Sequence, residues 1–118
     1  MKDMTLAYNA KLYEVVDSII NNKTRTIFLR NNENQIIGCL TEGDVLRAFV
    51  NGSHRNSDSH LFMNTNFLFY QERLSDLELA HVFLQFGVLA LPILDQSRKL
   101  LEIQFPMEAI RRLLNTQQ

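Results

Sequence analysis

The 118-residue sequence predicts an α/β fold in which two β-α-β-β-α repeats pack sheet to sheet with approximate two-fold symmetry. Two segments, residues 26–40 and 90–104, both have the pattern of a hairpin and align without a gap at an offset of 64 residues (90 − 26). A helical pattern precedes each segment and another follows it. Because half a chain of this length buries too small a core to fold well alone, we expect the two repeats, 1–59 and 60–118, to form one compact module.

The elements of the first repeat follow from hydrophobic spacing and turn residues. A short extended run is predicted over residues 5–8, and β-rich runs at 26–30 and 35–40 flank the polar turn 31–34. Thr41 begins a second helix, which stops before Gly52. The first helix is predicted from apolar residues at i, i+3, i+4, i+7 and i+8, namely Leu12, Val15, Val16, Ile19 and Ile20.

The second repeat has the same order of signals after a polar linker, residues 51–60. An extended run is predicted at 66–70, and Ser75 with Glu78 forms a capping box ahead of a helix that Gly87 ends. A second hairpin follows, and Pro106 suits the first turn of the last helix.

Composition limits the function classes. Twelve Lys and Arg stand against 13 Asp and Glu, which leaves no basic face for nucleic acid. No apolar run reaches the ~20 residues of a membrane span, and the first residues lack a signal-peptide core, so we expect a cytoplasmic protein. The single cysteine, Cys39, lies in an apolar run and is expected to be buried. The three histidines, His54, His60 and His81, lack the spacing of metal ligands, so no metal site is expected.

Two motifs resemble a known family. The segment IGCLTEGD at 37–44 matches a strand, a glycine and then Thr/Ser-x-x-Asp at a helix start, and LPILD at 91–95 looks like the family's strand that ends in Asp. The chain thus resembles the CBS (cystathionine β-synthase-type) domain pair, or Bateman module. The runs at 44–48, 51–52 and 62–66 are similar to CBS pairs attached to sugar-phosphate nucleotidyltransferases.

The resemblance implies a cleft between the repeats that accepts AMP, ADP, ATP or a related adenosine ligand, with no required cofactor. It places Thr41 at the phosphate, where a helix N-terminus also suits an anion, and Asp44 at the ribose hydroxyls. The other implied ligand-binding residues are Gly38 in the strand, the basic Lys23 and Arg25, and the apolar Leu6, Ala7 and Phe67 near the base.

A second interpretation of the same residues needs no ligand. Thr41 and Asp44 also have the spacing of a helix-capping box, and Asp in a first helical turn is favoured by the macrodipole. In the second repeat the offset replaces Gly38, Thr41 and Asp44 by Glu102, Phe105 and Glu108. That half is not expected to hold a nucleotide, and Phe105, a poor N-cap, is expected to be packed.

The sequence therefore predicts a regulatory module that senses a nucleotide and controls a tethered or partner enzyme, and no catalytic set is recognisable. The alternative is a dimerisation scaffold without a small-molecule ligand. A homodimer is expected in either case, because the last helices of the second repeat carry more apolar residues than one stripe needs: Phe83, Phe86, Leu113 and Leu114.

Overall fold

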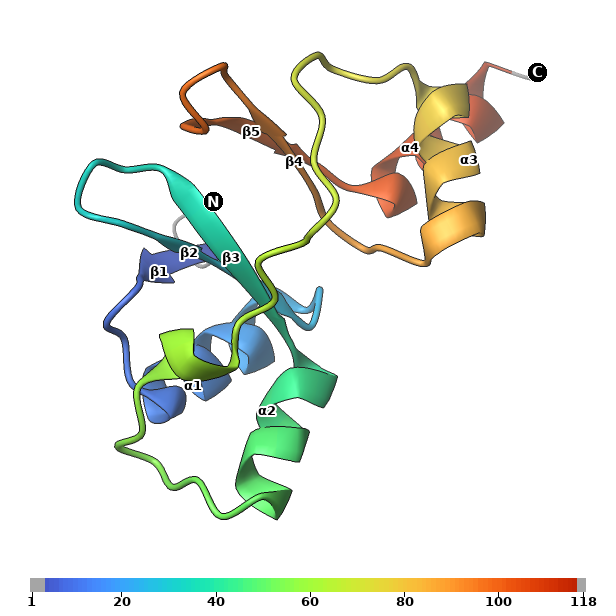
Figure 1. The fold of residues 1–118 in the computed structure, drawn as a ribbon. Helices are drawn as coiled ribbons and strands as arrows, with labels where there is room; N and C mark the ends of the chain where they lie inside the picture. The colour runs from blue at the N-terminus through green and yellow to red at the C-terminus, as the bar shows by residue number, and fades with distance from the viewer. Residues whose placement is uncertain (1–3, 117–118) are drawn as a thin grey trace. The chain divides into compact units, whose positions relative to one another are not determined.

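The computed structural model describes residues 4–116 and divides the chain into two compact units, Met1–Phe67 and Leu68–Gln118. The first unit runs from blue to yellow-green in Figure 1, and the second from yellow to red. Residues 60–67 thus belong with the first unit, because this segment covers the edge strand of that unit's sheet.

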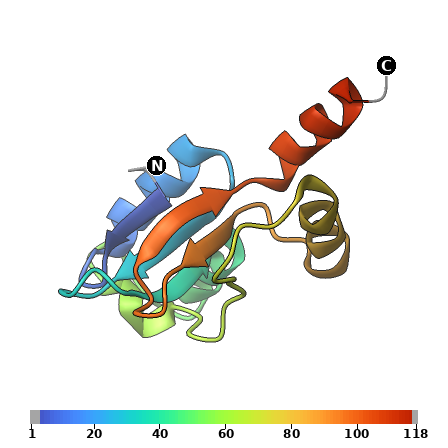
Figure 2. The same ribbon diagram turned by 90° about the horizontal axis from the view of Figure 1, so that it is seen from above.

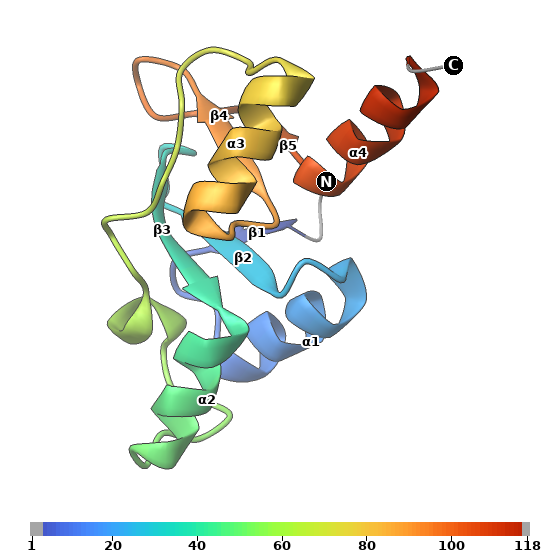
Figure 3. The same ribbon diagram turned by 90° about the vertical axis from the view of Figure 1, so that its right-hand side faces the viewer.

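The first unit is a three-stranded sheet with two helices (Figure 3). Strand β1 (Thr5–Ala7) pairs in parallel with β2 (Thr26–Arg30), and β2 pairs in antiparallel fashion with β3 (Ile36–Thr41). Helix α1 (Leu12–Asn22) connects β1 to β2, and α2 (Glu42–Val50) follows β3 without a loop. A 3-10 turn, η2 (Ser59–Phe62), comes next.

The core of the first unit lies between the sheet and its helices. Ile27 and Leu40 are paired across β2 and β3, so their side chains point to the same face, where both are fully buried. Burial of one such side chain stabilises the fold by roughly 1.5–3 kcal/mol. The core consists of Val15, Ile19, Ile27, Leu29, Leu40 and Val45.

The second unit contains α3 (Asp76–Phe86), the hairpin β4 (Leu91–Leu94) and β5 (Leu100–Gln104), and α4 (Pro106–Asn115). The hairpin and α4 are seen in orange and red in Figure 2. The predicted strand at 66–70 is wrong except for one parallel bridge between Tyr70 and Ile93. Phe67 packs on Phe28 of the first unit, with 6.2 Å between ring centroids, and only the end of the run is left for the second unit.

The two units repeat each other at the predicted offset. Helices α1 and α3 are both 11 residues long and begin 64 residues apart (76 − 12). The strand pair Ile27↔Leu40 corresponds to Leu91↔Gln104, again with a difference of 64 at each position. The predicted order of helix, hairpin and helix is thus confirmed in both units, and the packing of the two sheets together stays a prediction. Further features at the same offset are the bulges after Leu29 and Ile93 and the left-handed residues Asn34 and Arg98.

The predicted linker is a structured part of the first unit. The N–H groups of Leu12 and Tyr13 donate to the carbonyls of Ser57 (3.0 Å) and Arg55 (3.1 Å). These bonds satisfy donors that the first turn of any helix leaves without an intrahelical partner. The linker therefore caps α1, whose N-cap residue Lys11 makes no side-chain capping bond of the usual kind.

The start of α3 has the predicted capping box. Ser75 N–H donates to Glu78 Oε1 at 2.9 Å, and Glu78 N–H donates to Ser75 Oγ at 3.2 Å. These bonds to Ser75 lower the pKa of Glu78 below its ordinary value. The contribution of this carboxylate to stability is consequently present above the ordinary pKa and lost as pH falls through the lowered one.

We predict that Ser75→Ala lowers the free energy of unfolding by about 1 kcal/mol, because the cap is lost. The pKa of Glu78 should also rise toward its ordinary value. Urea denaturation and NMR titration measure the two effects. Gln85→Ala, an exposed change in the same helix, is the matched control, and equal stabilities of the two variants would contradict the capping role.

Candidate functional site

Thr41 and Asp44 form a reciprocal capping box at the start of α2. The Oδ2 atom of Asp44 accepts from the N–H (2.9 Å) and the hydroxyl (3.0 Å) of Thr41, and Asp44 N–H donates to Thr41 Oγ1 at 3.3 Å. The other carboxylate oxygen, Oδ1, accepts from Arg47 Nη2 at 2.7 Å. The capping interpretation is confirmed, and both carboxylate oxygens already have a donor from their own chain.

Arg25 lies beside the same helix start. Its carbonyl accepts from Glu42 N–H at 2.9 Å, and its Nε is 3.9 Å from Glu42 Oε2. The first turn of α2 thus carries two carboxylates, Glu42 and Asp44, together with the guanidinium groups of Arg25 and Arg47. These charges sum to zero, so a phosphate here would depend on the helix N-terminus and on how the arginines reorient.

Gly38 is a glycine because Met63 lies against it. A Cβ atom at this position would come within 2.3 Å of Met63 Sδ and 2.7 Å of its Cγ. Asn64 holds the Met63 segment along β3, donating to the Cys39 carbonyl at 2.8 Å and accepting from its N–H at 3.0 Å. The space above Gly38, one of the residues that the resemblance places at the ligand, therefore holds a side chain of the same unit.

The predicted apolar residues are spread over the first unit. Leu6 and Ala7 lie half-buried on β1, and Leu6 packs on the core side of the sheet. Leu6 pairs with Leu29, three residues along β2 from the partner of Thr41, which corresponds to about 10 Å. The structure therefore brings Thr41 and Asp44 together but does not bring Leu6 next to them.

The remaining predicted residues lie at the surface or in packing contacts. Lys23 and Arg25 are exposed and have left-handed backbones, with φ angles of 65° and 60°. Phe67 is 9% exposed, with its ring against Phe28. Two residues that sequence reasoning missed are Arg47 and Met63. The spacing of Arg47 three residues after Asp44 could have indicated the first, whereas Met63 is too far along the chain from Gly38 for any local pattern to indicate it.

Cys39 is buried in β3, as predicted. Burial, and secondly the negative charge of Asp44, raise the pKa of its thiol to about 12. The thiolate, which is the reactive form, is therefore scarce at neutral pH.

The second unit differs at the equivalent positions. Glu102, in place of Gly38, forms an ion pair with Arg73. Phe105, in place of Thr41, is half-buried and makes no capping bond. Gln104 is buried and bonds reciprocally with the backbone of Leu74, at 2.9 and 3.0 Å. The second unit thus has a charged side chain in an ion pair at the position of Gly38, and an aromatic side chain without a hydroxyl at the position of Thr41.

Within residues 4–116, no group of three or more His, Cys, Asp or Glu side chains is placed to hold a metal ion. None of the helices described there has the length and apolar character needed to cross a membrane.

An α/β module of two related repeats, β-α-β-β-α in the first unit and α-β-β-α in the second, is the class that this fold defines. Residues 1–51 match the family model of the CBS domain. No curated protein matches the chain. Among solved structures, OpuCA from Staphylococcus aureus is similar with a TM-score of 0.78 and 17% identity, over 100% of this chain and 97% of its own.

Two other similar structures contain bound molecules. The CBS domain pair of protein MJ0100, in complex with 5′-methylthioadenosine and S-adenosyl-L-methionine, has a TM-score of 0.73 and 17% identity, over 98% of this chain and 90% of its own. The CBS domain protein PAE2072 from Pyrobaculum aerophilum, complexed with AMP, has a TM-score of 0.72 and 15% identity, over 96% and 91%. The chain therefore has the fold of a CBS domain pair.

We predict that Gly38→Ala lowers the free energy of unfolding by about 1–3 kcal/mol, because the new methyl group overlaps Met63. Adding Met63→Ala should recover part of this loss. Gly43→Ala is the control, since its Cβ would approach only the flexible end of Arg47 and alanine favours a helix by up to about 1 kcal/mol. Chemical denaturation would show opposite signs for the two glycine variants, and equal effects would contradict the close approach.

Proposed function

We propose that this chain is a regulatory module that senses an adenosine-containing nucleotide through its first repeat and controls a tethered or partner enzyme. The observation that carries the proposal is the position of Thr41 and Asp44 at the N-terminus of α2, within the region that matches the CBS domain. The AMP and S-adenosyl-L-methionine complexes of structurally similar CBS pairs support an adenosine ligand. A cytoplasmic location, without nucleic-acid or membrane partners, is part of the same proposal.

The chemistry of Asp44 is compatible with a ribose. An ionised carboxylate has about four lone-pair directions, and Thr41 and Arg47 supply three donors to this one. One direction remains, and ribose hydroxyls could replace the Thr41 hydroxyl at another. Binding would therefore exchange hydrogen bonds, and rotation of Arg47 would free a cation for the phosphate.

The second repeat is not part of the proposed site. Glu102 pairs with Arg73, and Phe105 provides no hydroxyl for a phosphate. The proposal is thus one nucleotide per chain. The partner we propose is a sugar-phosphate nucleotidyltransferase, on the resemblance of residues 44–48, 51–52 and 62–66 to pairs attached to such enzymes.

Specific observations favour a second function, a dimerisation scaffold without a ligand. Met63 fills the space above Gly38, and both carboxylate oxygens of Asp44 already accept hydrogen bonds, from Thr41 and from Arg47. In this case side chains of the first repeat would occupy the position of the ligand. The function of the chain would then be to form a homodimer.

We predict that Asp44→Asn weakens nucleotide binding at least tenfold, because a charged acceptor for the ribose hydroxyls is lost. Thr41→Ala should lower the free energy of unfolding by about 1 kcal/mol and weaken binding of AMP more than binding of adenosine. Isothermal titration with adenosine, AMP, ADP and ATP measures both. Glu108→Gln, at the position equivalent to Asp44 in the second repeat, is the control and should bind like the wild type.

Two results of that titration would reject sensing. If Asp44→Asn binds as tightly as the wild type, the carboxylate has only its capping role. If none of the four compounds binds the wild type at millimolar concentration, the scaffold function is favoured.

We also predict a homodimer in the absence of nucleotide. Of the four apolar residues that motivate it, Phe86 and Leu114 are 52% and 71% exposed, whereas Phe83 and Leu113 are half-buried. Exposed apolar side chains in such numbers mark an interface. Light scattering at tens of micromolar protein should give twice the chain mass of 13.7 kDa, and a mass of one chain would contradict the prediction.

A further inference from the structure

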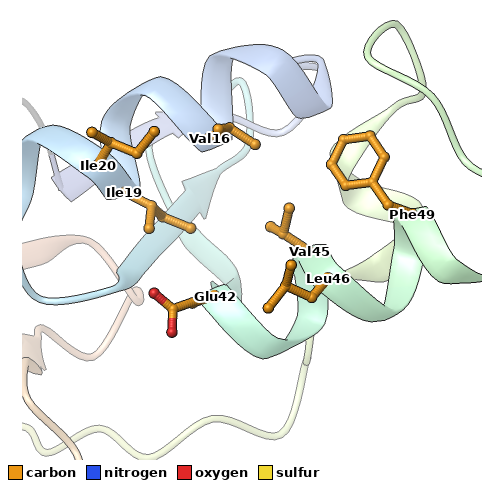
Figure 4. Close-up of a pocket in the computed structure, with 7 residues that line it drawn as sticks. All are labelled: Val16, Ile19, Ile20, Glu42, Val45, Leu46 and Phe49. Atoms are coloured by element: carbon orange, nitrogen blue, oxygen red, sulfur yellow. The ribbon is translucent and has the colours of Figure 1, made fainter.

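The described residues offer a partner two kinds of surface. The groove between α1 and α2 is lined by apolar side chains and by one carboxylate, that of Glu42 (Figure 4), and such a lining fits many kinds of partner. The outer edge of β5, on the side away from β4, offers backbone N–H and C=O groups instead. Because these groups have fixed directions and spacing, the edge defines its partner more narrowly than the groove does.

The hydrogen bonds of β4 show which backbone groups of β5 point outward. Pro92 has no N–H, and its carbonyl accepts from Tyr70 N–H at 3.2 Å, on the side of β4 away from β5. Pro92 therefore exchanges no hydrogen bond with Ile103, its partner across the hairpin. In an antiparallel pair, a residue of this kind directs its N–H and C=O to the other side of its strand. The N–H and C=O of Ile103 thus point to the outer edge of β5.

The equivalent residue of the first unit has a partner at its outer edge. Cys39 corresponds to Ile103 (103 − 39 = 64), and it pairs with Phe28 as Ile103 pairs with Pro92. The N–H and C=O of Cys39 form two reciprocal hydrogen bonds with Asn64, at 3.0 and 2.8 Å, in an antiparallel bridge. The segment around Asn64 therefore closes the edge of β3.

No segment within residues 4–116 closes the edge of β5 in this way. The N–H and C=O of Ile103 have no hydrogen-bond partner there, although the residue is only 6% exposed. Buried backbone groups are paired in the great majority of cases, since an unpaired one costs about as much as a lost hydrogen bond. A strand edge with such groups is a template for another strand. The sheet of the second unit is consequently able to accept one.

The side chains beside this edge limit what can pair there. Glu102, which is already in an ion pair, replaces Gly38 of the first unit. A side chain as large as Met63, which lies against Gly38, therefore has no room at the equivalent place. Leu101 is 59% exposed and offers an apolar contact. The added strand thus needs a small residue directly before the one that pairs with β5, and an apolar residue farther along.

We propose that the outer edge of β5 receives an extended segment of a partner polypeptide, which pairs in antiparallel fashion with the N–H and C=O of Ile103. Apart from Met63, the segment has the uncharged, extended character of residues 62–66, because that stretch covers the equivalent edge of the first unit. Strand addition takes its affinity from main-chain hydrogen bonds and its specificity from side-chain contacts. The site lies within the second unit and does not rest on the proposed nucleotide site.

Hydrogen exchange tests whether the edge is open in the full chain without a partner. We expect the Ile103 amide to exchange about tenfold faster than the Cys39 amide, because only the Cys39 amide donates to another backbone group. NMR measures both rates in one sample. Equal protection of the two amides would mean that another part of the chain already covers the edge, and would overturn the proposal.

A synthetic peptide tests the occupant. The probe has the sequence of residues 60–68 with Met63→Ala, which keeps the covering strand and removes its large side chain. On binding to the full chain it should slow exchange of the Ile103 amide about tenfold and leave the Cys39 amide unchanged. The matched control peptide is N-methylated at the position of Asn64 and should not bind, because it lacks the donor. Absence of binding by the probe, or equal binding of the two peptides, would overturn the backbone pairing.

Two variants of the protein give an independent readout. Ile103→Pro removes the outward N–H at a place where a strand tolerates proline, and should weaken binding of the probe about tenfold. Glu102→Gly reopens the space above β5 and keeps every backbone donor. The peptide with the original Met63 should bind the Glu102→Gly protein more tightly than the Met63→Ala peptide does, the reverse of their order on the wild type. Failure of this order to reverse would overturn the proposed register, whether or not the proline variant folds.

Discussion

The pairing of Ile27 with Leu40 is the constraint on which the first unit depends. Both side chains are fully buried on the face that α1 and α2 cover. A slip of one residue would turn every side chain of β3 to the opposite face, so this register is strongly fixed. It also sets the site, because Thr41 follows Leu40 directly and must end the strand where α2 begins.

The short connection from β3 to α2 makes capping and ligand binding compete for the same atoms. With no loop between the elements, the last strand residue is also the N-cap, and its hydroxyl and the Asp44 carboxylate close the first turn. A ligand at this point would gain preorganised groups but would have to replace bonds within the protein. Each hydrogen bond contributes a net stabilisation of about 1 kcal/mol. A ligand would therefore bind here only if its hydrogen bonds to the protein are at least as favourable as those that it replaces.

Sequence reasoning found the repeat because periodicity and turn chemistry are local. The capping boxes of Thr41–Asp44 and Ser75–Glu78 needed only a spacing of three residues, and both are present. The strand predicted at 66–70 failed because Phe67 packs on Phe28, a tertiary contact that overrides strand propensity. Met63 above Gly38 was missed for the same reason, since only the folded chain brings these residues together.

The differences between the repeats follow from a few positions on equivalent helices. Arg47 and Arg111 are equivalent (111 − 47 = 64), but Arg47 is held by Asp44, whereas Glu108, at the corresponding place, pairs with Arg112. Glu42 is likewise replaced by Pro106, which removes the carboxylate from the start of α4. The first repeat therefore has a carboxylate at the start of its second helix and an arginine paired with Asp44, whereas the second repeat has Pro106 at the start of α4. Because these positions differ while the backbone order is shared, sequence divergence after the repeat can determine which of the two repeats binds a ligand.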